Sequence, residues 1–424
     1  MEKTAYREWM RLDNMANLYP AIERFSAAPV FRVQAKLDRQ VEPAVLEEAL
    51  NMCLKRFPYF KVRLKRGLFW AYLERNEKPA KVWPDGPYPC TGMNYRANNH
   101  YLFRVRYREN AVALEVLHAL TDGGGAMVFL KTLIAQYLRL SGEAIAPCKE
   151  LGVWDINEEP DEEEFADSFL KYYNKDVKSL GIKSRAFHFK GKKFRQDVVS
   201  VVRGEMSGRQ AAEAAKKFGL SVTEYLVAVY LQALLNVQAK TRNKRPVRVS
   251  VPVNLRNFFP SKSMRNFTNF VLCEADPRLG VYRFEDIAAQ VHHTMRRGVI
   301  KNNLVKSFSG NVNSEKNFLV RALPLGIKTI ILSLIYHFKG ENQYSGSLSN
   351  LGVVKLPPDM ERFVEDFSCY LAPNTINPTN CGAVCYKDRL AICFTRTVKE
   401  SHIEKEFFTI LVKHGVKVKV ESKT

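Results

Sequence analysis

The chain has 424 residues and a formal net charge of +21, from 65 lysines and arginines against 44 aspartates and glutamates. Hydrophobic residues make up 46% of it and aromatic residues 11%, which supports packed cores and excludes a chain that is disordered along its length. The length exceeds what one hydrophobic core usually reaches and no short repeat is present, so we expect two domains.

A strand, a helix and a hairpin open the first domain. Apolar and polar residues alternate over 31–37, which is the pattern of a half-buried strand. A helix is predicted from Pro43 to Phe57, because apolar residues recur there at helical spacing and Pro58 ends the pattern. Alternation over 60–64 and an apolar run over 68–73 flank Gly67 and predict a hairpin.

The next two strands lead to a histidine. Alternation over 103–107 and 112–118 predicts two antiparallel strands, with His118 at the end of the second. Asp122 and three glycines follow, and an amphipathic helix is predicted over 129–138. An imidazole between a strand and a glycine loop is a common scaffold for a functional site.

An acidic segment separates the two domains. Residues 155–164 contain seven acidic residues and no basic one, a composition that resists burial. We interpret it as an exposed crossover, with an anionic regulatory segment as the alternative. The predicted division is a first lobe over 1–154, a linker over 155–195 and a second lobe over 196–424.

The second lobe again mixes helices and strands. Two reciprocal helix caps are predicted, at Ser207 with Gln210 and at Ser221 with Glu224. Alternation over 247–253 predicts a strand that leads to Arg256. A short strand is predicted between 346 and 352, further strands over 382–398, and a helix and a strand at the end of the chain.

Cysteine spacing and hydropathy bear on the compartment. The eight cysteines include no CxxC pair, which favours reduced thiols over a metal site or a disulfide framework. No apolar run at the start resembles a signal peptide and none is long enough to span a bilayer, so we expect a cytoplasmic protein. Residues 325–338 predict a buried or surface-lying helix, and weak contact with a membrane surface stays open for it.

The chemistry of His118 has two interpretations. A neutral imidazole at the end of a strand can take a proton from an attacking alcohol, amine or thiol. It can equally be a hydrogen-bonded histidine in the core of the lobe. Asp122 is expected to point away from the site and to pair with a cation, which would fix the glycine loop.

Three motifs in order carry a resemblance that covers nearly the whole chain. The run from His118 to Gly123 resembles the HxxxDG signature of the coenzyme-A-dependent acyltransferase superfamily, which includes chloramphenicol acetyltransferase. VPVNLR with the following NFTNFV resembles a strand and an Asn-bearing segment of that superfamily's second lobe. SLSNLG, at 347–352, is similar to the SNLG strand of alcohol acetyltransferases.

The resemblance implies an α/β fold (an α+β sandwich) of two chloramphenicol-acetyltransferase-like lobes, with the active site in a tunnel between them. His118 would be the general base, while Ser349 with Asn350 beside it would bind the oxyanion. A backbone-bonded strand hydroxyl is the alternative for Ser349. Asp122, Gly123 and Arg256 would support the site, with Arg256 as the partner of Asp122 or, alternatively, a plain surface arginine.

Two departures narrow the resemblance to microbial alcohol acetyltransferases. Leu117 stands where condensation domains and wax-ester synthases have the first histidine of HHxxxDG, and no DFGWG segment of the plant type is present. Adjacent His292 and His293 cannot share one helix face, so we interpret them as structural. Lys244, Arg245, Arg296 and Arg297 could contact coenzyme A phosphates, but no phosphate loop singles any of them out, and the residues that bind coenzyme A stay unassigned.

The predicted function is acyl transfer from coenzyme A, of an acetyl or a short to medium acyl group, to a hydroxyl or amine acceptor without an acyl-enzyme. Acyl-CoA is expected as co-substrate, with a small or lipid-like acceptor, no permanent cofactor, no metal, no nucleic acid and a monomeric state. Two alternatives stay open: an inactive scaffold of the same fold, and a basic protein that binds an anionic surface or nucleic acid.

Overall fold

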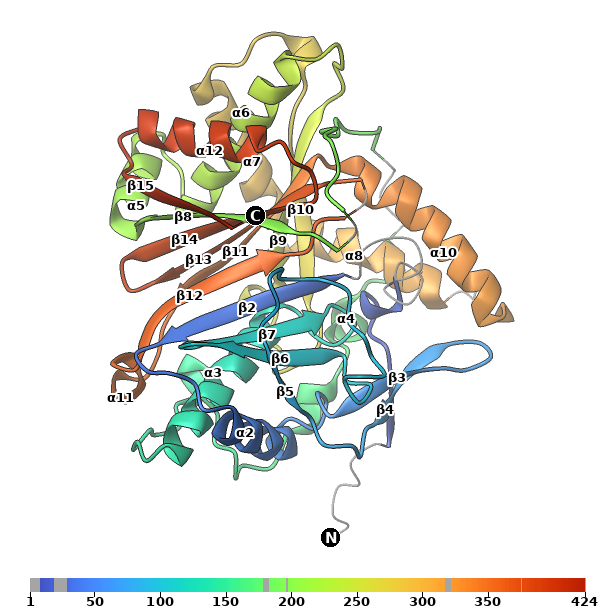
Figure 1. Ribbon diagram of the computed structural model, residues 1–424. Coiled ribbons are helices and arrows are strands. Elements are labelled where there is room, and N and C mark those ends of the chain that lie inside the picture. Colours follow the sequence, from blue (N-terminus) through green and yellow to red (C-terminus); the bar gives the residue numbers. More distant parts are fainter. Residues whose placement is uncertain are drawn as a thin grey trace.

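The computed structural model describes residues 8–18, 29–177, 183–195, 197–316, 322–374 and 376–423, apart from the side chains of 335–339 and of residue 423. Two lobes lie one above the other, each with a β-sheet and covering helices (Figure 1). The N-terminal part of the chain builds most of one lobe and the C-terminal part builds the other.

A five-stranded sheet forms the centre of the first lobe. Its strands run in the order β12 (Val364–Leu371), β2 (Val30–Leu37), β7 (Ala111–Leu117), β6 (Phe103–Arg108) and β5 (Val82–Pro84). Helices α2 (Pro43–Arg56) and α3 (Gly123–Leu140) cover one face of this sheet. The strands β2, β6 and β7 and both helices lie where the sequence predicts them.

A small sheet projects from the side of this lobe. It consists of β1 (Trp9–Arg11), β4 (Ala71–Arg75) and β3 (Val62–Arg66), and β3 and β4 form the predicted antiparallel hairpin around Gly67. The tip of the hairpin points away from the body of the molecule (Figure 1).

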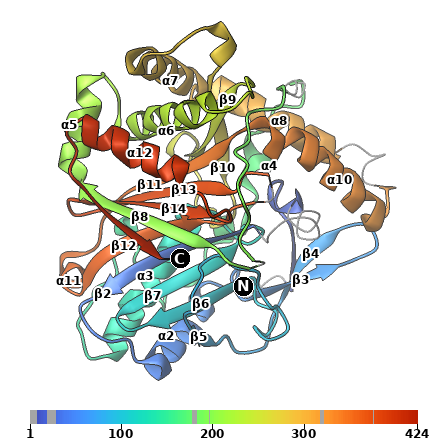
Figure 2. The ribbon, with the colours of Figure 1, turned by 45° about the horizontal axis from the view of Figure 1, so that its top comes forward.

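A seven-stranded sheet forms the second lobe. Its strands run in the order β10 (Thr268–Ala275), β9 (Val247–Asn254), β11 (Gly346–Val354), β13 (Thr379–Tyr386), β14 (Arg389–Arg396), β8 (Ser200–Ser207) and β15 (Val418–Lys423). Helices α5 (Gly208–Lys217), α6 (Val222–Ala239), α7 (Phe284–Gly298) and α12 (His402–Lys413) pack together over one face, as Figure 2 shows.

One strand joins the two lobes. β12 follows β11 of the second lobe in the chain, yet it pairs antiparallel with β2, Phe367 opposite Ala35. It also crosses β13, where a methyl group on Gly382 would lie 2.4 Å from the carbonyl oxygen of Cys369. The missing side chain at Gly382 therefore lets the backbones of the two lobes approach closely. The division at 154 and 195 stays a prediction.

The acidic segment is less exposed than expected. Residues 155–163 are half-buried or exposed, but Glu164 is 1% exposed, and both its oxygens accept hydrogen bonds from Arg56 at 2.8 Å. Arg56 itself is fully buried, on α2. A carboxylate with a buried guanidinium partner can enter the interior, which composition alone does not reveal.

The two predicted helix caps differ in their outcome. Ser221 and Glu224 form the reciprocal capping box at the start of α6. Ser207 caps α5 through the N–H of Gln210, but the side chain of Gln210 accepts a hydrogen bond from the N–H of Lys417 instead of returning one to the cap. The second box is therefore half formed, because a distant segment competes for the glutamine.

Shorter helices and two further long ones complete the fold. The remaining elements are α4 (Ser168–Tyr172), α8 (Lys301–Lys316), α10 (Leu325–Lys339), α11 (Pro358–Glu361), η1 (Ala16–Leu18), η2 (Lys149–Leu151), η3 (Glu162–Phe165), η4 (Leu255–Asn257), η5 (Pro277–Leu279) and η6 (Glu341–Gln343). No single helix among those described is long and apolar enough to cross a bilayer. Only α5 and α6 taken together, with a 75° bend between them, reach that length and composition.

Candidate active site

His118 follows β7 directly and is held from both sides of its backbone. Its N–H donates to the carbonyl oxygen of Pro29 at 3.0 Å, and its own carbonyl oxygen accepts a hydrogen bond from Nδ2 of Asn266 at 2.8 Å. The imidazole is half-buried, and its centre lies 4.5 Å from that of the Phe31 ring. Because Pro29 precedes β2 and Asn266 precedes β10, His118 is fixed between the two lobes.

Burial keeps the imidazole neutral. It lowers the pKa of His118 from 6.5 to about 4, and the charge of Asp122 and a hydrogen bond with Asn266 oppose this shift only in part. At neutral pH the ring is therefore uncharged, which is the state that a general base needs.

Asp122 organises the loop that follows His118. Its Oδ1 caps α3 by accepting from the N–H groups of Gly124 and Gly125, each at 3.1 Å. Its Oδ2 accepts from Arg256 at 2.7 Å and from the N–H of Phe267 at 2.8 Å. The predicted pairing of Asp122 with Arg256 is thus present, and it joins the two lobes.

The three glycines pack against the second lobe. A methyl group on Gly123 would lie 2.8 Å from Cδ2 of Leu351, on the strand of the SNLG motif. On Gly125 it would lie 2.2 Å from Oγ1 of Thr121 and 2.7 Å from the carbonyl oxygen of Met264. Gly125 therefore faces the tighter restriction, because a backbone atom cannot move aside as a leucine side chain can.

The segment 254–268 of the second lobe wraps around the HxxxDG loop. Thr121 donates through its hydroxyl to the carbonyl oxygen of Met264 at 2.5 Å. Asn266 donates through Nδ2 both to His118 and to Oδ2 of Asp13, the latter at 3.0 Å. Asp13 is fully buried, and its burial raises its pKa to about 6 although Arg265 opposes the shift. Asn266 thus links the backbone of His118 to a buried carboxyl group.

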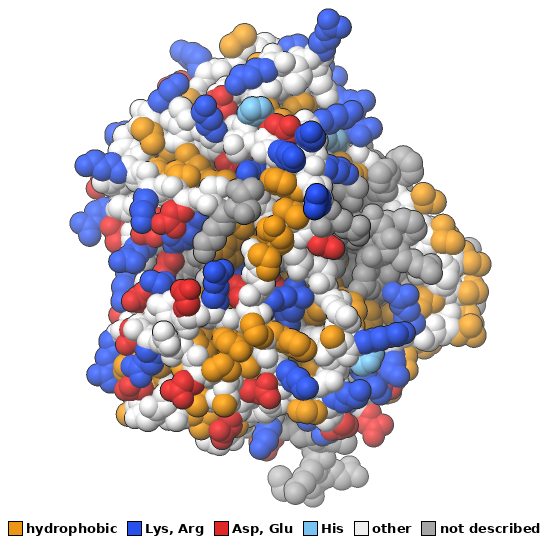
Figure 3. Space-filling model, in the orientation of Figure 1, with side chains coloured by type: hydrophobic (Ala, Val, Ile, Leu, Met, Phe, Trp, Pro, Cys, Tyr) orange, Lys and Arg blue, Asp and Glu red, His pale blue; other side chains and the backbone are white. Residues whose placement is uncertain are grey.

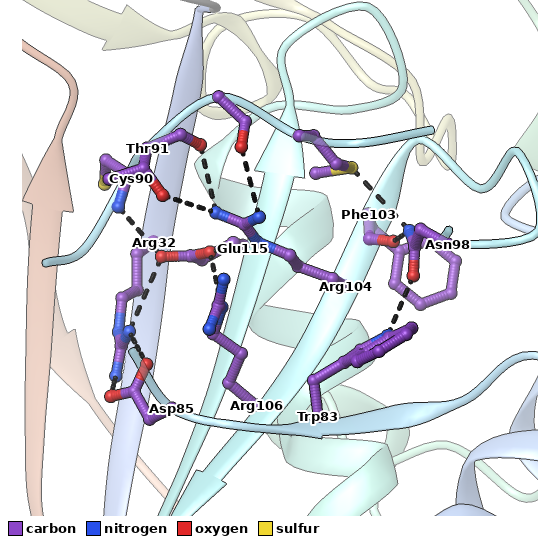
Figure 4. A network of polar contacts seen from close by, with 12 residues as sticks. Arg32, Trp83, Asp85, Cys90, Thr91, Asn98, Phe103, Arg104, Arg106 and Glu115 are labelled. Atoms are coloured by element: carbon purple, nitrogen blue, oxygen red, sulfur yellow. Dashed lines mark hydrogen bonds and ion pairs between the residues drawn. The ribbon is translucent and has the colours of Figure 1, made fainter. Parts of the chain in front are cut away.

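A network of buried charged side chains connects β7 to its two neighbouring strands. Glu115, which is fully buried, contacts Arg104 at 2.5 Å, Arg106 at 3.1 Å and Arg32 at 3.5 Å (Figure 4). Arg32 and Arg104 lie directly opposite Glu115 on the two neighbouring strands, and they lower the pKa of its carboxyl group although burial opposes this. The three strands are therefore tied together three residues before His118.

The predicted oxyanion residues lie on β11, but their side chains diverge. Ser349 is half-buried and lies opposite Gly382 of β13. Neighbouring residues of a strand point to opposite faces. The Asn350 amide donates to the hydroxyl of Thr223 at 2.9 Å, and its oxygen accepts from the N–H of Gly352. Asn350 thus shapes the bulge in β11, and the structure does not bring it to the same face as Ser349.

The strand of Ser349 nevertheless meets the loop of His118. Leu351 touches Gly123. Ser349 lies two positions before Leu351 on the same strand, so the Cα atoms of these two residues are at most about 7 Å apart. β11 pairs with β9 only through Gly346 and Ser347, so the two strands separate before Ser349. The resemblance named both segments, and the fold brings them together.

Sequence reasoning missed the residues that clamp His118. Asn266 lies in NFTNFV, which resembles the Asn-bearing segment of the superfamily, so a signal existed, but no role was assigned to it. Asp13 and Thr121 gave no signal, because their partners are far away in the chain. Contacts between residues that are far apart in the chain leave no local pattern in the sequence.

The other candidates lie elsewhere. His292, on α7, has Nδ1 3.4 Å from Glu224, which Arg296 also approaches at 3.6 Å. In the described part of the chain, no group of three or more His, Cys, Asp or Glu side chains could hold a metal ion. The residues that would bind coenzyme A stay unassigned.

The fold is similar to that of known acyltransferases and condensation domains. No family model and no curated protein match the chain. The structure of Fusarium sporotrichioides TRI101 complexed with coenzyme A and T-2 aligns over 97% of this chain and 99% of its own, at 12% identity and a TM-score of 0.63.

Two further solved structures support the same fold. TRI3 trichothecene 15-O-acetyltransferase from F. sporotrichioides aligns over 96% of this chain and 94% of its own, at 12% identity and a TM-score of 0.58. The first condensation domain of the CDA synthetase aligns over 97% and 95%, at 13% identity and a TM-score of 0.55. The predicted fold of two chloramphenicol-acetyltransferase-like lobes is confirmed, and the tunnel between them stays a prediction.

Proposed function

We propose that the protein transfers an acyl group from coenzyme A to a hydroxyl or amine acceptor, with His118 as general base. The observation that carries the proposal is the position of His118: a neutral imidazole clamped by backbone contacts from both lobes, beside the loop that touches the SNLG strand. The similar structures support it, since one is a complex with coenzyme A and another is a trichothecene 15-O-acetyltransferase.

In the proposed reaction His118 first accepts a proton and later returns it. The acceptor O–H or N–H gives its proton to His118 while the acceptor oxygen or nitrogen attacks the thioester carbonyl carbon. The tetrahedral intermediate collapses with cleavage of the carbon–sulfur bond, and the imidazolium returns the proton to the leaving thiolate. The products are the ester or amide and free coenzyme A, with no covalent acyl-enzyme.

Ser349 is the proposed donor to the oxyanion. Its strand lies beside the glycine loop, and a single hydroxyl donor placed at a developing oxyanion is worth on the order of 10²-fold in rate. Asn350 is not part of this proposal, because its amide is engaged by Thr223 and Gly352.

The activity is tested by thiol release from acetyl-, butyryl- and palmitoyl-coenzyme A with a panel of alcohols and amines. We expect acceptor-dependent release by the wild type and loss of at least about 10³-fold in His118→Ala, the upper range for a lost general base together with its positioning. Product mass spectrometry then separates esters from amides and identifies the acyl chain.

His292→Ala is the matched control, since His292 lies on α7 and contacts Glu224. It should retain the activity of the wild type. Equal activity in His118→Ala and the wild type would remove His118 as the base. Silence of the wild type with every donor and acceptor would favour an inactive scaffold.

A further inference from the structure

Helix α10 carries an apolar stripe that faces away from the protein. Ile327, Ile330, Ile331 and Leu334 are 48%, 57%, 41% and 54% exposed. Their spacing of three and four residues places them on one side of the helix, which is the arrangement that normally faces a core. The stripe is therefore an amphipathic face without a partner among the described residues.

The tip of the β3–β4 hairpin extends this face. Leu68, Phe69 and Trp70 are 73%, 37% and 52% exposed. The tip is attached to the start of α10, because the N–H of Leu325 donates to the carbonyl oxygen of Leu68 and Nζ of Lys328 donates to that of Phe69, both at 2.8 Å. We call the combined surface the apolar ridge; it consists of Leu68, Phe69, Trp70, Ile327, Ile330, Ile331 and Leu334.

The ridge protrudes, and positive charge accompanies it. Figure 3 shows hydrophobic side chains along the outer edge of the molecule over α10, with Lys and Arg side chains beneath them. The hairpin strands and their turn, 62–75, contain four basic residues and one acidic residue, Glu74, which pairs with Arg63 and Lys65, whereas 316–340 contains four basic residues and no acidic one. Among the described residues, Lys65 and Arg66 stand on the hairpin just before Leu68.

This combination fits a lipid bilayer with anionic headgroups. Scattered single apolar residues are normal on a surface, but seven on one helix face and one adjoining loop are not. Tryptophan and aliphatic side chains at a protruding tip suit the interface between headgroups and acyl chains. Basic residues beside them, and the net charge of +21, attract the surface of an anionic membrane.

We infer that the apolar ridge docks the protein on the surface of an anionic bilayer, with α10 lying in the plane of the interface. α10 has 15 residues and a charged Lys328 near its start, so it is too short to span the bilayer. The inference does not depend on the acyltransferase activity, and its test uses a separate measurement.

The test is cosedimentation with vesicles of phosphatidylcholine alone and of phosphatidylcholine mixed with phosphatidylglycerol. The wild type should bind the mixed vesicles and bind them less at high salt. Leu68→Asp, Ile330→Asp and the double variant should lower the partition coefficient, the double variant by about tenfold or more, because each removes buried apolar area and adds a charge.

Leu279→Asp is the matched control, because Leu279 is 79% exposed but lies on η5, outside the ridge. It should bind as the wild type does, and all variants should keep the wild-type melting temperature, since every changed residue is largely exposed. Intrinsic fluorescence with brominated lipids adds a second measurement: quenching should be lost in Trp70→Phe if Trp70 enters the interface.

Three outcomes would overturn the inference. The wild type fails to bind either kind of vesicle, or the ridge variants bind as tightly as the wild type, in which case the charge alone is responsible. In the third, sedimentation velocity shows a dimer that Leu68→Asp and Ile330→Asp dissociate while vesicles bind no protein, and the ridge is then an interface between two copies of the chain.

Discussion

Replacing Arg256 should weaken the contact between the two lobes at the candidate site. Its guanidinium donates to Oδ2 of Asp122 at 2.7 Å, to the carbonyl oxygens of Ser263 and Arg265 at 3.0 and 2.5 Å, and to Oδ1 of Asn254 at 3.3 Å. The side chain of Asp122 is 1% exposed and that of Arg256 is 18% exposed. Removal of the guanidinium leaves a buried carboxylate without its cation.

The expected magnitudes follow from these contacts. Loss of one partner of a buried pair costs 3–5 kcal/mol, so Arg256→Ala should lower the free energy of unfolding by about 3 kcal/mol, the lower end, because Asp122 keeps three backbone donors. Arg256→Lys retains the charge but cannot reach the carbonyl oxygens of Ser263 and Arg265, so about 1–2 kcal/mol should be lost.

Urea unfolding of the two variants, of Asp122→Asn and of the double variant measures the coupling. We expect a coupling energy of about 1–3 kcal/mol between Arg256 and Asp122. Thiol release should fall as well, by on the order of 10²-fold in Arg256→Ala, because the segment that Arg256 fixes also positions His118 through Asn266.

Arg278→Ala provides the comparison, since Arg278 pairs with Asp276 at 2.5 Å but its side chain is 61% exposed. That change should have little effect on the free energy of unfolding, because the pair lies at the solvent-exposed surface. If Arg256→Ala destabilises no more than Arg278→Ala, or if the coupling with Asp122 vanishes, the ion pair does not brace the site and the reasoning fails.

Three further predictions concern the loop and its base. The kcat/KM of the wild type should stay level from neutral pH down to about 5 and then fall with an apparent pKa near 4. Activity needs neutral His118 and is lost as the pH drops through the pKa of this residue. A fall near pH 6 would instead assign the acidic side of the pH profile to Asp13. Asn266→Ala should lower kcat by about 10–10²-fold with little change in KM, since its amide holds the backbone of His118 in place; an increase in KM alone would contradict this role. Gly125→Ala should destabilise the fold by about 2 kcal/mol or more in thermal unfolding, because the added methyl meets a carbonyl oxygen of the other lobe, whereas Gly326→Ala, in open space on α10, should stabilise it slightly; equal effects would refute the packing argument.

Local patterns predicted most elements of the fold. The strands β2, β6, β7 and β9 follow from period-two alternation, and α2 and α3 follow from helical spacing with proline or glycine at their ends. The Ser221 box on α6 formed as predicted because both of its partners lie within one turn of the chain. These signals come from residues that are close together in the sequence, so the sequence alone reveals them.

Long-range pairing was not predictable in this way. The polar face of the first sheet was expected to be exposed, yet Arg32 and Arg104 are 4% and 8% exposed, because Asp85 pairs with Arg32 and Glu115 pairs with Arg104 in the interior. Glu164 is buried for the same reason, with Arg56 as its partner. Alternation marks which residues share a face but not what covers that face.

The candidate site was predictable only in part. The residue pattern alone left two interpretations of His118, and the resemblance supplied the motifs around Ser349 and Arg256. The contact of Arg256 with Asp122 is present, whereas the side chain of Asn350 turns to Thr223. That orientation depends on a bulge between Asn350 and Val353, which no periodic pattern reveals.

The position of β12, which follows β11 of the second lobe but pairs with β2 of the first, affects how the protein folds during synthesis. The first sheet lacks its edge strand until residue 371 has left the ribosome, because β12 is encoded near the end of the chain and pairs with β2 near its beginning. During synthesis the row of N–H and C=O groups on β2 stays open to other chains. Nascent molecules on crowded ribosomes should therefore depend on chaperones that shield β2, and shortened chains that stop before Val364 should aggregate rather than accumulate as a free first lobe.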